Sequence, residues 1–253
     1  YYVMESKSVK DTLLTRRSIR RFEREAITQE QLDFISEAIR NTPTSYNGQQ
    51  FTVIDVDDQT IKEKLYEIIG QKQIKTCNRF MAFCIDYNRI GSFAKSEGVG
   101  MPAFRNTMDG VIVGIVDASL AMMSAVAAAD SVGLGCCCIG YARTANPRAV
   151  AETLGLPEGV FVVCGLSLGV PREMPDMKPK MPASLLIHHN GYRKDDMLPE
   201  LKVYDAEIKQ YNATRAGGTS DNDWLRHILS YYDEALGYEM LEALKERGFD
   251  IKK

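Results

Sequence analysis

Apolar residues recur along the chain at two spacings, and these spacings predict helices alternating with strands. Thr28 followed by Gln31 has the form of a capping box, and apolar residues then recur at helical intervals, so a helix is expected up to shortly before Pro43. The same reasoning predicts further helices over 61–69, 109–132, 147–155, 198–212 and 223–247. Runs rich in β-branched, aromatic or other apolar residues predict strands over 51–56, 80–85, 136–140 and 160–168. Four strands set among helices indicate one α+β domain over residues 1–253, in which about residues 198–253 form an extended C-terminal arm.

Residues 110–129 form an almost uninterrupted apolar stretch that is nearly long enough to cross a membrane. Asp117 lies inside this stretch, and Asp109 and Asp130 flank it. An aspartate at bilayer depth costs about 2.5–3.5 kcal/mol on insertion scales. A helix that is apolar on all sides can also lie at the centre of a core or at a subunit interface. We therefore expect a buried helix and no membrane association.

The composition is that of a globular protein, with 45% hydrophobic and 26% charged residues and a net charge of −3. This balance excludes a disordered chain and gives no overall attraction to nucleic acid or to anionic membranes. None of the six cysteines shows C-x-x-C spacing, and the neighbours in 136–138 would point to opposite faces of a strand. We expect buried, reduced thiols in a cytoplasmic protein, and no metal site.

The densest polar segment is 16–21, in which five of six residues are arginine or serine and none is acidic. A guanidinium group matches phosphate oxygens in two-point fashion, and a serine hydroxyl adds another donor. The segment is a candidate phosphate site, although a solvated basic surface or a nucleic-acid patch has the same composition.

Two further polar segments could serve a cofactor. Residues 41–50 offer hydroxyl and amide groups that both donate and accept, as the edge of a flavin ring requires, although turn chemistry alone explains Asn47-Gly48. Lys178 and Lys180 lie among prolines, where a fixed positive charge could stabilise a reduced, anionic cofactor. A rigid surface loop is the alternative for this second segment.

Several motifs of side-chain catalysis are missing from the sequence. There is no P-loop, no HExxH motif and no G-x-S-x-G elbow, and the glycines at 133, 135 and 140 have the wrong spacing for a dinucleotide fingerprint. We therefore expect an anion-anchored cofactor with its own reactivity, and we assign no catalytic side chain.

The order of the polar segments resembles the nitroreductase-like FMN-dependent oxidoreductases. The matching segments are 16–22, 44–49, 71–72, 138–143, 178–183, 211–215 and 224–227. Their order and the chain length are similar to the branch that contains the major oxygen-insensitive nitroreductase and the NADPH-preferring flavin reductases. The resemblance implies an α/β/α sandwich with a mostly antiparallel central sheet. It also implies FMN bound at a homodimer interface, with arms that reach across to the other subunit.

The resemblance assigns residues to FMN and one residue to the co-substrate NAD(P)H. They are Arg16, Arg17, Ser18 and Arg20 for the phosphate and ring edge; Thr44, Ser45, Asn47 and Gln49 in a loop often supplied by the other subunit; Gln71 at the ring; Ile139, Gly140 and Tyr141 lining the pocket; Lys178 and Lys180 supplying positive charge; and Arg215 for the substrate.

The activity implied by the resemblance is a ping-pong hydride relay from NAD(P)H through FMN to nitroaromatics, quinones or free flavin. Residues 216–223 contain acids where NADPH-specific relatives have further basic residues, so we expect a weakened preference for NADPH. One alternative is a flavin enzyme of the same fold with one specialised substrate, taken by dehydrogenation or dehalogenation, for which residues 92–105 could form a lid. A non-enzymatic module that binds a phosphate backbone is the other, and the net charge counts against it.

Overall fold

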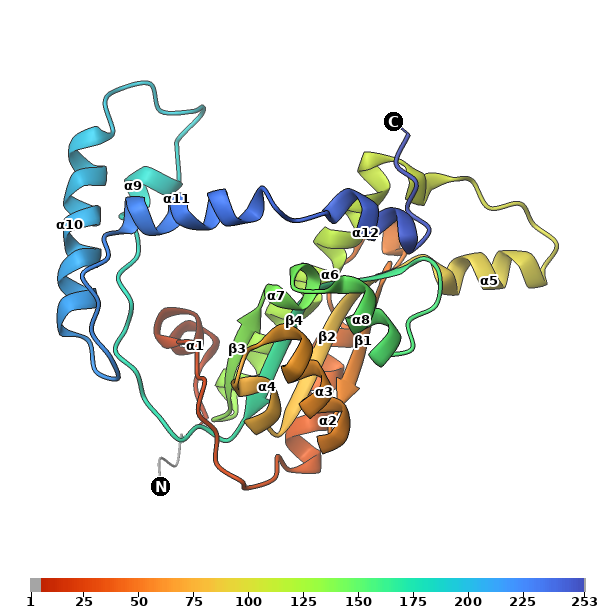
Figure 1. Ribbon diagram of the computed structural model, residues 1–253, viewed down its shortest axis with the longest axis horizontal. Helices are drawn as coiled ribbons and strands as arrows, with labels where there is room; N and C mark the ends of the chain where they lie inside the picture. The colour runs from red at the N-terminus through yellow and green to blue at the C-terminus, as the bar shows by residue number, and fades with distance from the viewer. Residues whose placement is uncertain (1–5, 253) are drawn as a thin grey trace. The chain divides into compact units, whose positions relative to one another are not determined.

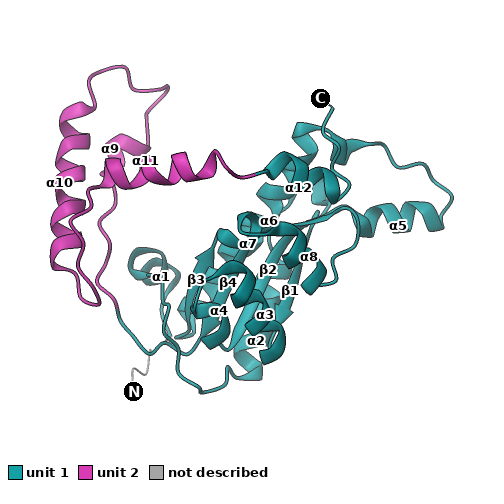
Figure 2. Cartoon of the chain, in the orientation of Figure 1, with its two compact units in different colours: residues 1–174, 239–253 teal, residues 175–238 magenta. Residues whose placement is uncertain are grey.

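The structure, a computed structural model, describes residues 6–252 and divides the chain into two compact units (Figures 1 and 2). The first unit runs to residue 174 and resumes at residue 239, and the second comprises residues 175–238. The helices and strands of the first unit are α1 (Val9–Thr15), α2 (Gln29–Arg40), β1 (Phe51–Val56), α3 (Gln59–Ile69), α4 (Gln73–Thr76), β2 (Arg79–Asp86), α5 (Asn88–Ser96), α6 (Met108–Ser131), β3 (Gly135–Ile139), α7 (Tyr141–Thr144), α8 (Pro147–Thr153), β4 (Val160–Gly169) and α12 (Met240–Glu246). Those of the second unit are α9 (Ala183–Leu186), α10 (Leu198–Thr214) and α11 (Trp224–Ala235).

The four strands form one sheet in the order β1-β2-β4-β3, and each neighbouring pair is antiparallel. The pairing register places Phe51 of β1 opposite Ile85, near the end of β2. Cys136 of β3 lies opposite Leu168 of β4, which in turn lies opposite Arg79 at the start of β2. The beginnings of β1 and β3 therefore occupy diagonally opposite corners of the sheet.

Helices cover both faces of the sheet, because the strands carry apolar side chains on both faces. On β2, Met81, Phe83 and Ile85 pack in the core beneath α2 and α6. The alternate residues Phe80 and Ala82 pack with α3, α4, α7 and α8 on the other face. Phe80 and Phe83 are fully buried, and burying each such side chain contributes about 1.5–3 kcal/mol. The predicted α+β sandwich with an antiparallel sheet is confirmed.

Local signals set most of the element boundaries as predicted. Thr28 Oγ1 accepts the N–H of Gln31 at 3.2 Å, and the Gln31 side chain accepts the N–H of Thr28 at 3.0 Å, which completes the capping box of α2. Gly70 ends α3 in the left-handed region, with φ of 79°. Asn146 caps α8, and Pro147 occupies its first position.

The single helix predicted over 223–247 is wrong. α11 ends at Ala235 and α12 begins only at Met240. Between them, Leu236 and Gly237 donate to carbonyls three residues earlier, in tighter turns than an α-helix makes. Glycine has a low helix propensity, and the chain passes from the second unit to the first at 238–239. Residues after this point join the first unit, where Ala243 and Phe249 enter the core.

Helix α6 lies against the sheet and α2. Within the described residues it is the one helix long and apolar enough to cross a membrane, yet half of its most apolar window is buried inside the first unit. This packing agrees with the core helix expected from the sequence. The side of α6 that the first unit leaves exposed is also apolar, and its residues are Met108, Ile112, Ile115, Val116, Leu120 and Met123.

Candidate functional site

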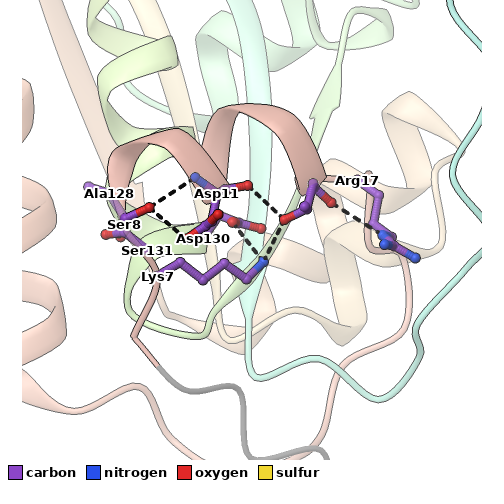
Figure 3. A network of polar contacts seen from close by, with 8 residues as sticks. Lys7, Ser8, Asp11, Arg17, Ala128, Asp130 and Ser131 are labelled. Atoms are coloured by element: carbon purple, nitrogen blue, oxygen red, sulfur yellow. Dashed lines mark hydrogen bonds and ion pairs between the residues drawn. The ribbon is translucent and has the colours of Figure 1, made fainter.

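The arginine-rich segment begins at a helix that is fixed to the end of α6. Figure 3 shows Lys7, whose Nζ contacts the Asp130 carboxylate of α6 at 3.0 Å. Ser8 caps α1 by accepting the N–H of Asp11 at 3.1 Å. The arginine-rich segment follows directly after α1, which ends at Thr15. The contact between Lys7 and α6 therefore fixes the chain shortly before the segment begins.

Residues 16–23 run beside β3 and across to the chain that follows β4. The N–H of Ile19 donates to the Cys136 carbonyl at 2.9 Å, and Ser18 forms a parallel bridge with Cys136. The N–H groups of Arg20 and Arg21 both donate to Glu173 Oε1, at 2.7 and 3.2 Å. These bonds fix the backbone of the segment and leave the exposed Arg20 side chain outside the ion pairs formed by the described residues.

Three of the predicted phosphate-site residues lie near Cys137 of β3, because the segment that carries them bridges to the neighbouring Cys136. Burial raises the pKa of the Cys137 thiol, and the nearby Arg20 charge, a hydrogen bond from Ser18 and the Arg16 charge oppose that rise. Arg16 also carries a buried Nε that has no hydrogen-bond acceptor among the described residues. A buried donor left unpaired costs about 1–3 kcal/mol. An anionic ligand would satisfy it, so the residues present fit a phosphate group.

The predicted residues of the pocket lining lie beside this cluster. Gln73 lies near enough to Cys137 to oppose the rise in the pKa of its thiol, and Gln73 Nε2 donates to Gln71 Oε1 at 3.2 Å. Ile139 as a whole residue is only 3% exposed and packs in the core. Gly140 and Tyr141 follow directly at the junction of β3 and α7. Arg17 lies at the edge of the group, where its Nε donates to the Thr15 carbonyl at 3.4 Å (Figure 3).

The polar loop 44–50 precedes β1 and so belongs to the opposite edge of the sheet. Tyr46, Asn47 and Gln49 adopt left-handed φ values of 60°, 53° and 51°. Such conformations are strained for residues other than glycine and are typical of functional loops. Within the loop, Thr44 Oγ1 accepts the N–H of Gln49 at 3.2 Å, and Gln49 Nε2 donates to the Asn47 carbonyl at 3.1 Å.

One chain does not bring the polar loop and the arginine-rich segment together. The two edge strands are three strand spacings apart, or about 14 Å. The loop also lies at the opposite end of the strands, as the pairing register shows. The sequence-predicted residues of the first unit therefore form two separate groups.

In the second unit the three predicted cations line one cavity of about 260 Å³. Lys178, Lys180 and Arg215 share it with aromatic side chains, among which Tyr204 and Trp224 meet edge to face at 5.7 Å between ring centroids. Arg215 Nε donates to the Gly218 carbonyl at 2.8 Å, which holds the guanidinium near the loop that follows α10. A cavity with cations and aromatic rings suits a ligand that carries both phosphate and heterocycle.

Sequence patterns did not identify four residues that contact these groups. Gln73 bonds to Gln71, Glu173 accepts the N–H groups of Arg20 and Arg21, and Asp117 and Arg89 bond to the backbone of loop 44–50. Asp117 is the one charged residue inside the apolar stretch 110–129. From the sequence, we used it only as an argument against a membrane-spanning helix. Gln73, Arg89 and Glu173 lie in polar stretches of the sequence. The partners of Arg89 and Glu173 are also far away along the chain: Gln49 is 40 positions from Arg89, and Arg20 is 153 positions from Glu173.

Comparisons with known proteins cover nearly the whole chain. The model of the nitroreductase family matches residues 13–170, and the model of the C-terminal domain of that family matches residues 178–252. An FMN reductase (NAD(P)H) of Bacillus subtilis strain 168 is 36% identical over 244 residues, which are 96% of this chain and 98% of the relative. An oxygen-insensitive NADPH nitroreductase of Salmonella typhimurium is 34% identical, covering 94% of this chain and 97% of the relative.

Among solved structures, the hypothetical oxidoreductase YcnD from Bacillus subtilis superposes with a TM-score of 0.92 at 37% identity, covering 97% of this chain and 99% of that one. The two family models meet near the boundary between the two compact units. The chain therefore belongs to the nitroreductase family of oxidoreductases.

Proposed function

We propose that this protein binds FMN and reduces electron-poor acceptors at the expense of NAD(P)H. The observation that carries the proposal is the cluster of Arg16, Ser18 and Arg20 around β3, with its buried and unpaired Arg16 Nε. The relatives named as FMN reductase and nitroreductase support the same reading. The chemistry that FMN supplies when bound is hydride transfer from NAD(P)H to acceptors such as nitroaromatics, quinones or free flavin, in a ping-pong sequence.

The residues of this chain contribute position and charge. Arg16 and Arg20 neutralise the phosphate, and Ser18 adds a hydroxyl donor. We assign Gln71, Ile139, Gly140 and Tyr141, which lie beside the cluster, to the lining of the ring site. The lysines at 178 and 180 add positive charge, which favours a reduced, anionic ring. No side chain has to serve as an obligatory acid or base.

We further propose that the functional unit is a homodimer. The loop carrying Thr44, Ser45, Asn47 and Gln49 lies at the opposite corner of the sheet from the arginine-rich segment, so a second copy has to supply it if both contact one cofactor. The exposed apolar side of α6 offers a surface for that copy, since such a surface is costly to leave in water. A cytoplasmic location agrees with six free thiols, of which only Cys138 is exposed.

We propose that the coenzyme binds at the cavity of the second unit, where Arg215 would hold one of its phosphates. The two acids of the following loop differ in environment: Asp223 is buried, caps α11 and pairs with Arg226, whereas Asp221 is exposed. Asp221 lies between Ser220 and Asn222, which line the cavity, so we propose it as the acid that repels the 2′-phosphate of NADPH. Replacing Asp221 by Asn should raise the ratio of kcat/KM for NADPH to that for NADH by about two- to fivefold, the range of an exposed charge interaction. A wild-type enzyme that strongly prefers NADPH would contradict this assignment.

The decisive experiment for the function is the absorbance spectrum of the purified protein. We expect flavin bands that NAD(P)H bleaches without oxygen. Arg20→Ala should deplete bound FMN, while Arg24→Ala, which removes another exposed arginine nearby, should not. Full retention of FMN by the Arg20 variant would contradict the proposed phosphate site. Turnover of one substrate with negligible activity on quinones and nitro compounds would favour the specialised flavin enzyme.

A further inference from the structure

The buried carboxylate of Asp117 holds the polar loop 44–50 from beneath. Asp117 lies within α6 and is 0% exposed. Its Oδ1 accepts the N–H of Ser45 at 2.9 Å, and its Oδ2 accepts the N–H of Gln50 at 3.1 Å. Among the described residues, no cation pairs with it. A buried carboxylate is costly without hydrogen bonds, and here both oxygens are used to fix the two ends of one loop.

Arg89 holds the same loop from the other side. Its Nη2 donates to the carbonyls of Gln49 and Phe51, at 2.9 and 2.6 Å. Asp86 fixes the backbone of Arg89, because its Oδ1 accepts the N–H of Arg89 at 3.1 Å. An anionic side chain therefore binds N–H groups of the loop while a cationic side chain binds its carbonyls, so each charge meets the backbone group of opposite polarity.

The loop between these contacts needs such support. The left-handed residues Tyr46, Asn47 and Gln49 each store strain, which persists only where the surroundings impose the conformation. A further bond, between Thr42 Oγ1 and Ser124 Oγ at 2.8 Å, ties the chain before the loop to α6. Without the two charged contacts, the loop is expected to relax toward ordinary backbone conformations.

We propose that Asp117 and Arg89 are positioning residues that hold loop 44–50 in the conformation that presents its hydroxyl and amide groups to the edge of a flavin ring. The inference rests on the proposed function, because it takes FMN as the ligand of the loop. It adds two residues that contact the loop through its backbone and act on the ligand through the loop.

The first test is hydrogen exchange of FMN-free Asp117→Asn. The substitution keeps the side-chain shape but leaves one acceptor oxygen and an NH₂ group, so one of the two backbone N–H groups loses its acceptor. The amide that loses its acceptor, Ser45 or Gln50, should exchange about tenfold faster. Those of β2 and β4 should stay protected. Asp109→Asn, at the exposed start of the same helix, is the matched control and should leave the loop amides unchanged.

The second test measures FMN itself. The Kd for FMN should rise about tenfold in Asp117→Asn, and the visible circular dichroism of the flavin should change even when FMN is saturating. A variant that is merely less stable would not alter that spectrum. Arg89→Gln is the second variant, used if Asp117→Asn fails to fold, because Arg89 is exposed and its replacement is less disruptive. The Kd of this variant for FMN should rise roughly two- to tenfold.

The outcomes separate this inference from the proposed function. Unchanged exchange at the loop amides in both variants would overturn it. Faster exchange with an unchanged Kd and spectrum would also overturn it, because the loop would then lie outside the flavin site while FMN binding by the wild-type protein upheld the function. A wild-type protein that binds no FMN would overturn both.

Discussion

Tyr87 shows how a single buried group in the first unit couples stability to pH. It is 2% exposed, its hydroxyl donates to the Gly110 carbonyl at 2.6 Å, and its ring meets Phe104 and Phe249 edge to face. Burial raises the pKa of Tyr87 to about 12, and the negative charge of Asp117 adds to the rise. The folded protein therefore resists forming the phenolate, whereas the unfolded chain ionises near the ordinary value.

This difference predicts a loss of stability in alkali. The contribution of Tyr87 is fully present below about pH 10 and is lost as the pH rises toward 12, in total about 2–3 kcal/mol. Tyr87→Phe should cost about 0.5–1.5 kcal/mol near neutral pH through the lost hydrogen bond, yet its unfolding free energy should fall less steeply above pH 10. Urea unfolding at several pH values checks this, with Tyr232→Phe, an exposed tyrosine, as the control. Parallel curves for wild type and Tyr87→Phe would contradict the prediction.

Whether the contact of a single residue could be predicted depended on how far its partner lies along the chain. The cap at Thr28 was predictable because its partner is three residues away. The role of Asp117 was not, because its partners Ser45 and Gln50 lie 72 and 67 residues away. The grouping of Arg16 with Arg20 was visible as composition, but the buried, unpaired Nε of Arg16, which supports the proposed phosphate site, is a feature of the folded chain.

At the scale of elements, α6 packs closely on the sheet because it carries a glycine at the contact. A Cβ added at Gly114 would lie 2.3 Å from Cγ2 of Ile85 on β2. Real side chains do not approach so closely, so the helix or the strand would have to move. Gly114 lowers the intrinsic helix propensity of α6 but allows the helix to lie close to the sheet.

Gly114→Ala should consequently destabilise the protein by about 1–3 kcal/mol through overpacking, although alanine favours a helix by about 1 kcal/mol. Gly91→Ala in α5 is the matched comparison, because its Cβ would meet only the flexible Met101 side chain at 3.2 Å. We expect this control to be neutral or slightly stabilising. Urea midpoints of both variants against wild type decide the matter, and a Gly114 variant at least as stable as wild type would count against close packing here.

Helices and strands with a periodic apolar pattern or a cap could be predicted from the sequence. Very short helices, and helix ends that depend on packing, could not. All four strands and the helices α2, α3, α6, α8 and α10 agree with the expected ranges to within a few residues. The four-residue helices α4, α7 and α9 span little more than one turn, too short to show a period. The apolar pattern of 223–247 is compatible with one helix or with two. The break between α11 and α12 was therefore not predictable from the pattern, because it depends on α11 belonging to the second unit and α12 to the first.

At the scale of the whole molecule, strand order decides how many chains a flavin site needs. The polar loop leads into β1, and the arginine-rich segment lies against β3, so the sheet separates them on one chain. Motif order along the sequence cannot show this, because it does not state which strands are edges. In the homodimer that we propose, the second copy would dock on the apolar exposed side of α6.

A site shared between two subunits can be tested by mixing two defective proteins. Arg20→Ala and the double variant Asn47→Ala, Gln49→Ala should each bind little FMN as homodimers. After unfolding and refolding together, half of the dimers are mixed, and each mixed dimer combines both defects in one site and none in the other. About a quarter of the wild-type FMN capacity should therefore return. The control refolds Arg20→Ala with itself and should recover nothing. If the mixture binds no more FMN than its components, while light scattering shows that dimers form, the loop and the arginines serve different sites and the shared site is wrong.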